Sequence, residues 1–317
     1  MEFRFELALC AALERPDRVL ARQLGGAVAE PGARIADVCL LERGPGFERR
    51  AAISPETIPP AAIEADVGPG RAVPVREAFD LRPERANAAI DAAVQAGYLE
   101  RERRDGTPCV RTTARYPDDW VGRLVAIENK PDLGRPGDLA AQLRFDVALG
   151  LFDEVWLATA SYVTGAHRNR IPDPVGILRF DPDTGERETV REPTPLTVDE
   201  PGVEIRAETP ARTDVALVSA EEKARKRRRI AERAYGKGWR PDPPACAHAS
   251  VTGDGRPRCD VFDRVVDPGS DCGSACDAFD PADPPRLDRE RFRENRSAWM
   301  GGSRAGPRRQ SGLDRFG

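Results

Sequence analysis

The hydrophobic positions of the first 50 residues predict one helix followed by one buried strand. Residues 3–13 carry apolar side chains at helical spacing. Residues 34–41 are mostly apolar and end just before a Gly-Pro-Gly turn, which is typical of a buried strand. Asp37 lies inside this apolar run, where an unpaired charge is costly. The pattern therefore indicates a strand that carries an acid for a specific reason.

A second stretch, residues 121–190, alternates between strand and helix patterns. It predicts strands at 123–127, 154–160 and 175–180, with a helix at 138–151 between the first two. This alternation predicts an α/β fold with a mixed sheet flanked by helices.

Residues 51–115, between these stretches, are predicted to form a small inserted domain. Its clearest helix runs from Pro83 to Ala96, with Gly97 just past its end, and Asp105-Gly106 predicts a hairpin turn. A helix that leads into such a hairpin resembles the end of a winged helix, whose second helix would be residues 73–79. This resemblance implies a DNA-facing surface formed by five arginines: Arg82, Arg85, Arg101, Arg103 and Arg104. A winged helix that serves as a protein contact or a spacer is the alternative.

Composition excludes some classes of protein. The chain has 317 residues, a net charge of −4, and no run of 18 or more apolar residues, so we expect no membrane span. The N-terminus lacks the pattern of a signal peptide, and we expect a cytoplasmic protein. The net charge shows no global basic field, but local patches decide nucleic-acid contact.

Lysine usage singles out one position. Only four of the 49 basic residues are lysines, and Lys130 is the only lysine in the first 222 residues. A solitary lysine among arginines suggests a site that needs a compact ammonium group.

The segment Glu128-Asn129-Lys130 follows the apolar residues 124–127 and has the composition of a nuclease site. In an E-x-K strand the glutamate and the lysine share a face, while Asn129 points away and its carbonyl remains available. Phosphodiester hydrolysis needs a divalent cation and a positive charge near the phosphate, and Mg²⁺ prefers carboxylate ligands. We expect Asp37 to supply the second acid, with Asp118 or Asp119 as the alternative.

The order of these elements resembles the PD-(D/E)XK, or restriction-endonuclease-like, superfamily and its RecB-like branch. The chain as a whole resembles a family of unknown function from halophilic archaea. The superfamily resemblance implies that Asp37 and Glu128 bind Mg²⁺ or Mn²⁺ and that Lys130 orients water and stabilises the phosphate. It also implies that Gln142 on the next helix supports the site and that Glu6 lies behind it.

Four cysteines predict a metal in the C-terminal region: Cys246, Cys259, Cys272 and Cys276. They lie in a segment without a clear core, where a bound metal supplies folding energy, and Zn²⁺ is the first expectation. His248 is a possible replacement ligand. The alternative implied by the RecB-like resemblance is an iron–sulfur cluster that uses Cys10 with the last three cysteines. Ordinary thiols are the third alternative.

These patterns predict a nuclease core in two parts, with two further segments at the C-terminal end. The predicted order is core (1–50), winged helix (51–115), core (116–215), basic helix and cysteine module (216–280), and a disordered tail (281–317). The expected function is metal-dependent hydrolysis of DNA, and a homodimer is possible. The alternative is a DNA-binding protein whose core has no catalytic activity.

Overall fold

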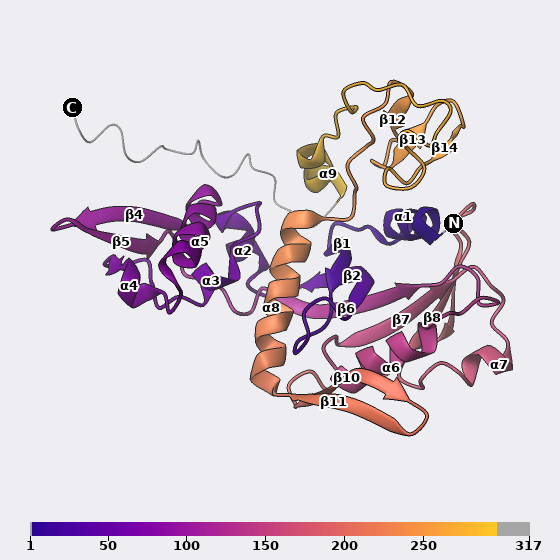
Figure 1. Ribbon diagram of the computed structural model, residues 1–317, viewed down its shortest axis with the longest axis horizontal. Coiled ribbons are helices and arrows are strands. Elements are labelled where there is room, and N and C mark those ends of the chain that lie inside the picture. The colour runs from indigo at the N-terminus through magenta and orange to yellow at the C-terminus, as the bar shows by residue number, and fades with distance from the viewer. Residues whose placement is uncertain (1, 297–317) are drawn as a thin grey trace. The chain divides into compact units, whose positions relative to one another are not determined.

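The computed structural model describes residues 2–296 and divides into two compact units (Figure 1). Unit 1 contains residues 2–42 and 123–296, and unit 2 contains residues 43–122. Residues 297–317, most of the tail for which the sequence predicts disorder, lie outside the described residues.

A six-stranded mixed sheet forms the centre of unit 1, as the α/β pattern predicts. Its strand order is β1-β2-β6-β7-β8-β9. The first two strands are antiparallel, β6, β7 and β8 run parallel, and β9 is antiparallel to β8. In chain order the strands are β1 (Arg18–Gly25), β2 (Ile35–Arg43), β6 (Val121–Asn129), β7 (Glu154–Thr159), β8 (Gly176–Phe180) and β9 (Arg187–Arg191).

Helix α1 (Glu2–Leu13) covers one face of this sheet, and α6 (Leu139–Leu149) lies on the other face (Figure 1). The core between α1 and the sheet includes Leu9 together with Val38 of β2 and Ile127 of β6. Because side chains alternate along a strand, the neighbours of these residues point toward α6. Asp37 and Glu128 therefore belong to the α6 face.

A hairpin and two helices complete the main body of unit 1. The hairpin β10 (Gly202–Thr209) and β11 (Arg212–Val218) contacts α6, and helix α8 (Ala220–Lys237) contacts β1. Helix α8 begins with a capping box, in which Ser219 and Glu222 satisfy each other's backbone amides. A short helix, α7 (Gly165–Arg168), lies between β7 and β8.

The end of unit 1 contains little regular structure. Strands β12 (Ala249–Val251), β13 (Pro257–Cys259) and β14 (Arg264–Val265) form a small antiparallel sheet. Helix α9 (Arg289–Arg296) follows, in the segment for which the sequence predicts disorder. Contacts with Arg240 stabilise it, since the Arg240 guanidinium lies 4.2 Å from the Phe292 ring centroid.

Unit 2 packs helices against a three-stranded sheet of order β3-β5-β4. Ile90 of α5 and Val110 of β5 are fully buried in its core. Its elements are α2 (Phe47–Ile53), α3 (Pro60–Ile63), β3 (Val73–Pro74), α4 (Val75–Ala78), α5 (Pro83–Gln95), β4 (Leu99–Arg104) and β5 (Thr107–Thr112).

Two turns of unit 2 have the backbone conformation that their sequence predicts. Asp105 and Gly106 have φ values of 47° and 79°, the left-handed pair that a two-residue hairpin requires. Gly97 has a φ of 77° directly after α5. The helix expected at residues 73–79 is shorter, because Pro74 forces an extended conformation on Val73 and α4 begins only at Val75.

No helix within the described residues is long and apolar enough to span a membrane.

Candidate active site

Two acids predicted from the sequence lie on neighbouring strands of unit 1. Asp37 is on β2 and Glu128 is on β6, and these strands are adjacent in the sheet. Glu128 is 6% exposed, whereas Asp37 is half-buried. Burial and the charge of Asp37 raise the pKa of Glu128 to about 7. The two carboxylates therefore share one electrostatic environment.

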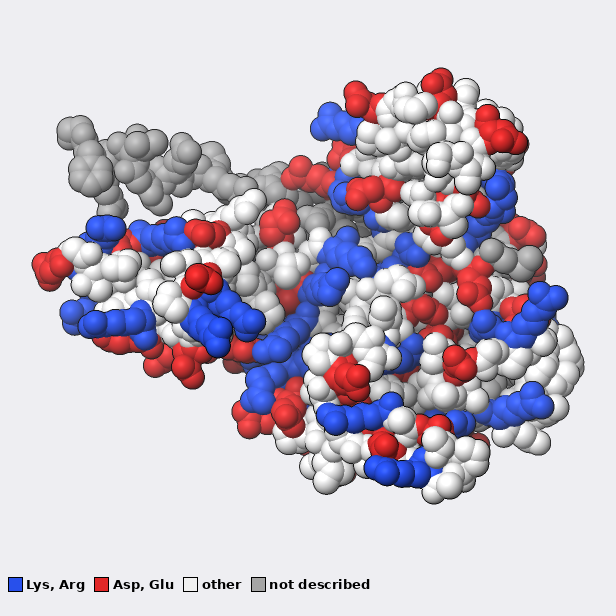
Figure 2. All heavy atoms as spheres, viewed as in Figure 1, with Lys and Arg blue, Asp and Glu red and all other residues white. Residues whose placement is uncertain are grey.

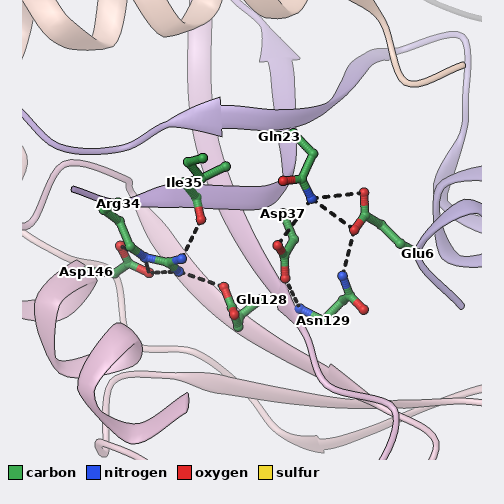
Figure 3. Close-up of polar contacts among 8 residues, drawn as sticks. All are labelled: Glu6, Gln23, Arg34, Ile35, Asp37, Glu128, Asn129 and Asp146. Atoms are coloured by element: carbon green, nitrogen blue, oxygen red, sulfur yellow. Dashed lines mark hydrogen bonds and ion pairs between the residues drawn. The ribbon is translucent and has the colours of Figure 1, made fainter. Parts of the chain in front are cut away.

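Arg34 connects Glu128 to a third carboxylate, Asp146 of α6 (Figure 3). Its Nη2 donates to Glu128 Oε2 at 2.7 Å and to Asp146 Oδ2 at 2.6 Å, and its Nε donates to Asp146 Oδ1 at 3.1 Å. Asp146 is 1% exposed, and burial raises its pKa. A buried guanidinium thus lies between two buried carboxylates.

Asp37 is held from both sides by neutral donors (Figure 3). The backbone amide of Asn129 donates to its Oδ2 at 3.0 Å, and Gln23 Nε2 donates to its Oδ1 at 3.3 Å. Gln23 has a φ of 54° at an irregular position of β1. This conformation lets its side chain also donate to Glu6 Oε2 at 3.1 Å. Burial raises the pKa of Asp37.

Glu6 extends the cluster from α1, on the other face of the sheet. Asn129 Nδ2 donates to its Oε2 at 2.8 Å, and Arg22 forms an ion pair with it. Glu6 is 3% exposed, and burial raises its pKa despite the Arg22 charge. Glu6 is therefore linked to Asn129 directly and to Asp37 through Gln23.

The acid cluster, defined as Glu6, Asp37, Glu128 and Asp146, is short of positive charge. Within the described residues, Arg22 and Arg34 are the cations that hydrogen-bond to it. Four carboxylates against two guanidinium groups leave two negative charges when all are ionised. In addition, Asn129 Oδ1 is buried and has no hydrogen-bond partner among residues 2–296, so one acceptor of the site is unsatisfied.

Lys130 differs from the expectation that it would share a face with Glu128. Strand β6 ends at Asn129, so the alternation of side chains does not extend to Lys130. Its Nζ pairs with Glu2 Oε1 of α1 at 2.6 Å, and its side chain is 22% exposed. Glu2 is close enough to raise the pKa of Asp37, so this ion pair borders the acid cluster.

The helix residue predicted to support the site is not the one that contacts it. Gln142 forms no side-chain hydrogen bond to the acid cluster in the part of the chain that the structure describes. Asp146, one turn further along α6, is linked to Glu128 through Arg34. Of the two alternative second acids, Asp118 and Asp119, Asp119 pairs with Arg49 at 2.6 Å in unit 2. Asp37, in contrast, accepts a hydrogen bond from the Asn129 backbone directly after Glu128.

Sequence reasoning missed three participants, namely Arg34, Gln23 and Asp146. Asp146 has a detectable signal, because it interrupts the apolar face of a helix whose other inward positions are leucine and phenylalanine. Arg34 precedes a buried strand, and nothing in its sequence neighbourhood marks it. Gln23 depends on a left-handed backbone conformation that its residue type does not predict.

No group of three or more acids, histidines or cysteines among residues 2–296 is arranged to hold a metal ion. The acid cluster nevertheless fits a divalent cation in charge and donor type, since Mg²⁺ prefers carboxylate oxygens and water. Glu128 Oε1 accepts no hydrogen bond from the described residues, and the partly exposed Asp37 lies next to it. Binding would require these side chains to adjust.

The four C-terminal cysteines lie in the last part of unit 1, within residues 241–288. The pKa of Cys272 is raised by burial and then by Asp271, with smaller effects from the thiols of Cys246, Cys259 and Cys276. Apart from two prolines, the buried apolar side chains of this segment are Cys246 and Val266. Cys10 is fully buried in the core under α1. Zinc, or the alternative iron–sulfur cluster, stays a prediction.

The five arginines predicted to contact DNA are all exposed on unit 2. Arg82 precedes the first residue of α5. Arg101 pairs with Asp91 at 2.5 Å, and Arg104 pairs with Glu102. The remaining two are Arg85 and Arg103.

Comparison with protein families places the chain in one of them. A model described as a family of unknown function (DUF5787) matches residues 19–281, and the chain belongs to this family. No curated protein and no solved structure matches the chain. The nuclease resemblance and the haloarchaeal origin stay predictions.

Proposed function

We propose that this member of the DUF5787 family is a metal-dependent nuclease that hydrolyses DNA phosphodiester bonds at the acid cluster. The observation that carries the proposal is the charge imbalance, in which four clustered carboxylates face two arginines. Uncompensated buried charges are costly, and proteins retain them where a cation or a reaction needs them. A divalent cation supplies the two missing positive charges.

The order of elements supports the same proposal. Helix α1, strands β1, β2 and β6, helix α6 and strand β7 follow one another, with an acid on β2 and another on β6. This is the order that the PD-(D/E)XK resemblance implies. Unit 2 interrupts it between β2 and β6, and its helix and hairpin arrangement supports the proposal of a DNA-binding winged helix.

Asp37 and Glu128 would hold Mg²⁺ or Mn²⁺, which when bound polarises the phosphate and lowers the pKa of the attacking water. The Asn129 amide and Gln23 fix the orientation of Asp37 through its two oxygens. Arg34 fixes Glu128 through Oε2 and leaves Oε1 available. Lys130, at the border of the cluster, exchanges its ion pair with Glu2 for the phosphate of the substrate and stabilises the charge that develops there.

The second candidate function is a DNA-binding protein whose core has no catalytic activity. It is favoured by the absence, among residues 2–296, of three ligands arranged around a metal position. The hydrogen bond from Arg34 to Glu128 also favours this second candidate, because it occupies one oxygen of a proposed metal ligand.

Cleavage of labelled DNA separates the two candidates. Duplex, single-stranded and branched substrates are incubated with Mg²⁺, Mn²⁺ or a chelator. We expect cleavage only with the divalent cation, and a loss on the order of 100-fold or more in Lys130→Ala and Glu128→Gln. The controls are Arg206→Ala and Glu186→Gln, both exposed in unit 1. Cleavage that survives Lys130→Ala unchanged, or that persists in the chelator, contradicts the proposal. A wild-type protein that binds DNA without cleaving any substrate supports the second candidate.

A further inference from the structure

Helix α8 carries a row of basic side chains along one side. Lys226, Arg229, Arg233 and Lys237 are three or four residues apart, so they lie on the same side of the helix. Figure 2 shows basic side chains following the course of α8 in Figure 1. We define these four residues as the α8 basic row.

The members of the row repel one another. Burial lowers the pKa of Lys226, and the charges of Arg229 and Arg233 lower it further, while Glu204 acts in the opposite direction. The pKa of Lys237 is likewise lowered by burial and then by Arg233 and Arg22. Like charges at this spacing destabilise a helix. A chain with a net charge of −4 that concentrates cations in this way has the local footprint of a polyanion-binding surface.

Other basic residues of α8 serve the fold instead. Arg227 donates to the Leu151 carbonyl and to Asp153, both at 2.7 Å, and Lys223 donates to the carbonyls of Thr197 and Glu200. Within the described chain, Lys226 and Arg233 form no hydrogen bond and no salt bridge. Lys226 and Arg233 are therefore distinct from the residues that anchor the helix, whereas Lys237 also contacts β1.

The row ends beside the acid cluster. Lys237 Nζ donates to the carbonyl of Arg22 at 2.6 Å and to that of Gln23 at 3.2 Å. The side chain of Gln23 contacts Asp37 and Glu6, and that of Arg22 pairs with Glu6. One strand, β1, thus connects the last cation of the row to the proposed catalytic site.

We infer that the α8 basic row binds the phosphate backbone of DNA and directs it toward the acid cluster. This inference rests on the proposed function, because it takes DNA as the ligand. The row spans residues 226–237, a rise of about 16 Å along the helix, which corresponds to about five phosphates along one strand of a duplex. An anionic membrane is the competing ligand. The apolar residues of α8, such as Ile230 and Tyr235, are buried, so the helix presents no apolar face for insertion.

The test is a salt titration of duplex binding with the full chain. The probe is a labelled duplex of about 20 base pairs, followed by fluorescence anisotropy in a chelator so that cleavage does not interfere. The variant is Lys226→Gln/Arg233→Gln, which spares Lys237 and the acid cluster. The control, Arg168→Gln/Arg206→Gln, removes the same charge from exposed positions of unit 1.

Loss of two phosphate contacts reduces the slope of log affinity against log salt by about 1.8. Raising the salt concentration from 50 to 200 mM weakens binding by some factor in wild type. In the variant this factor is therefore about tenfold smaller. The control keeps the wild-type slope. An unchanged slope in Lys226→Gln/Arg233→Gln, or binding to phosphatidylserine vesicles in place of the duplex, overturns the inference.

Failure of the proposed function gives a different result. If wild type does not cleave DNA but the variant shows the reduced slope, the nuclease proposal fails and the basic row stands. If wild type cleaves DNA and the variant keeps the wild-type slope, the nuclease proposal stands and the inference about the basic row fails.

Discussion

Replacement of Arg34 by methionine tests the electrostatics of the acid cluster. Methionine keeps most of the side-chain length but removes the guanidinium that lies between Glu128 and Asp146. Four donor–acceptor pairs to these carboxylates, between 2.6 and 3.2 Å, are lost together with the hydrogen bond to the Ile35 carbonyl, and the three charged side chains are at most 7% exposed. Breaking a buried ion pair by removing one partner costs about 3–5 kcal/mol. We therefore expect Arg34→Met to lower the free energy of unfolding by about that amount at pH 8 without divalent cations.

The penalty depends on pH in a defined direction. Arg34 lowers the pKa of both Glu128 and Asp146, so its removal raises both values further above those of the unfolded chain. A carboxyl with a raised pKa in the folded state destabilises the fold once pH exceeds the unfolded value, and most fully above the folded value. The loss should therefore be smaller at pH 5, where these groups bind protons, than at pH 8.

Urea unfolding monitored by circular dichroism, in a chelator at both pH values, measures this loss. Arg206→Met is the matched control, because Arg206 is exposed on β10, and it should change stability by no more than about 0.5 kcal/mol. A loss below about 1 kcal/mol for Arg34→Met at pH 8, or equal losses at the two pH values, would refute the assigned electrostatics.

Three further predictions concern other parts of the chain. Glu204 is fully buried and accepts the backbone amides of Val28, Ala29 and Glu30 at 2.6–2.8 Å. Glu204→Ala should therefore cost about 3 kcal/mol in urea unfolding, whereas a loss no larger than that of the exposed Glu208→Ala would count against this role. Elemental analysis should find about one Zn²⁺ per chain, lost in Cys272→Ser/Cys276→Ser; a colourless protein without zinc rules out both metal predictions. Alanine at the five exposed arginines of unit 2 should weaken duplex binding and reduce its salt dependence, and unchanged anisotropy titrations would favour a spacer role.

The strands and helices that form the site follow from patterns within single segments. Apolar runs predict β2 and β6, and the Asp105-Gly106 turn has the expected left-handed conformation. The acids Asp37 and Glu128 stand out because each is a charged residue in an apolar strand. Such features are local, so one sequence contains enough information to find them.

The connections between segments could not be predicted in the same way. Arg34 and Asp146 are 112 residues apart, and their ion pair depends on how α6 packs against the sheet. Lys130 lies just past the end of β6, so strand alternation places its side chain incorrectly. The helix expected at 73–79 is short because Pro74 fixes the local backbone, which the apolar pattern does not reveal.

Titration with Mn²⁺ tests most directly whether the acid cluster is a divalent-cation site. Isothermal titration calorimetry of the wild-type chain should show a single Mn²⁺ site, because the cluster lacks two positive charges. Glu128→Gln should abolish this binding, while Glu186→Gln should retain it. A wild-type chain that binds no Mn²⁺, or a Glu128→Gln chain that binds it equally well, would contradict the account.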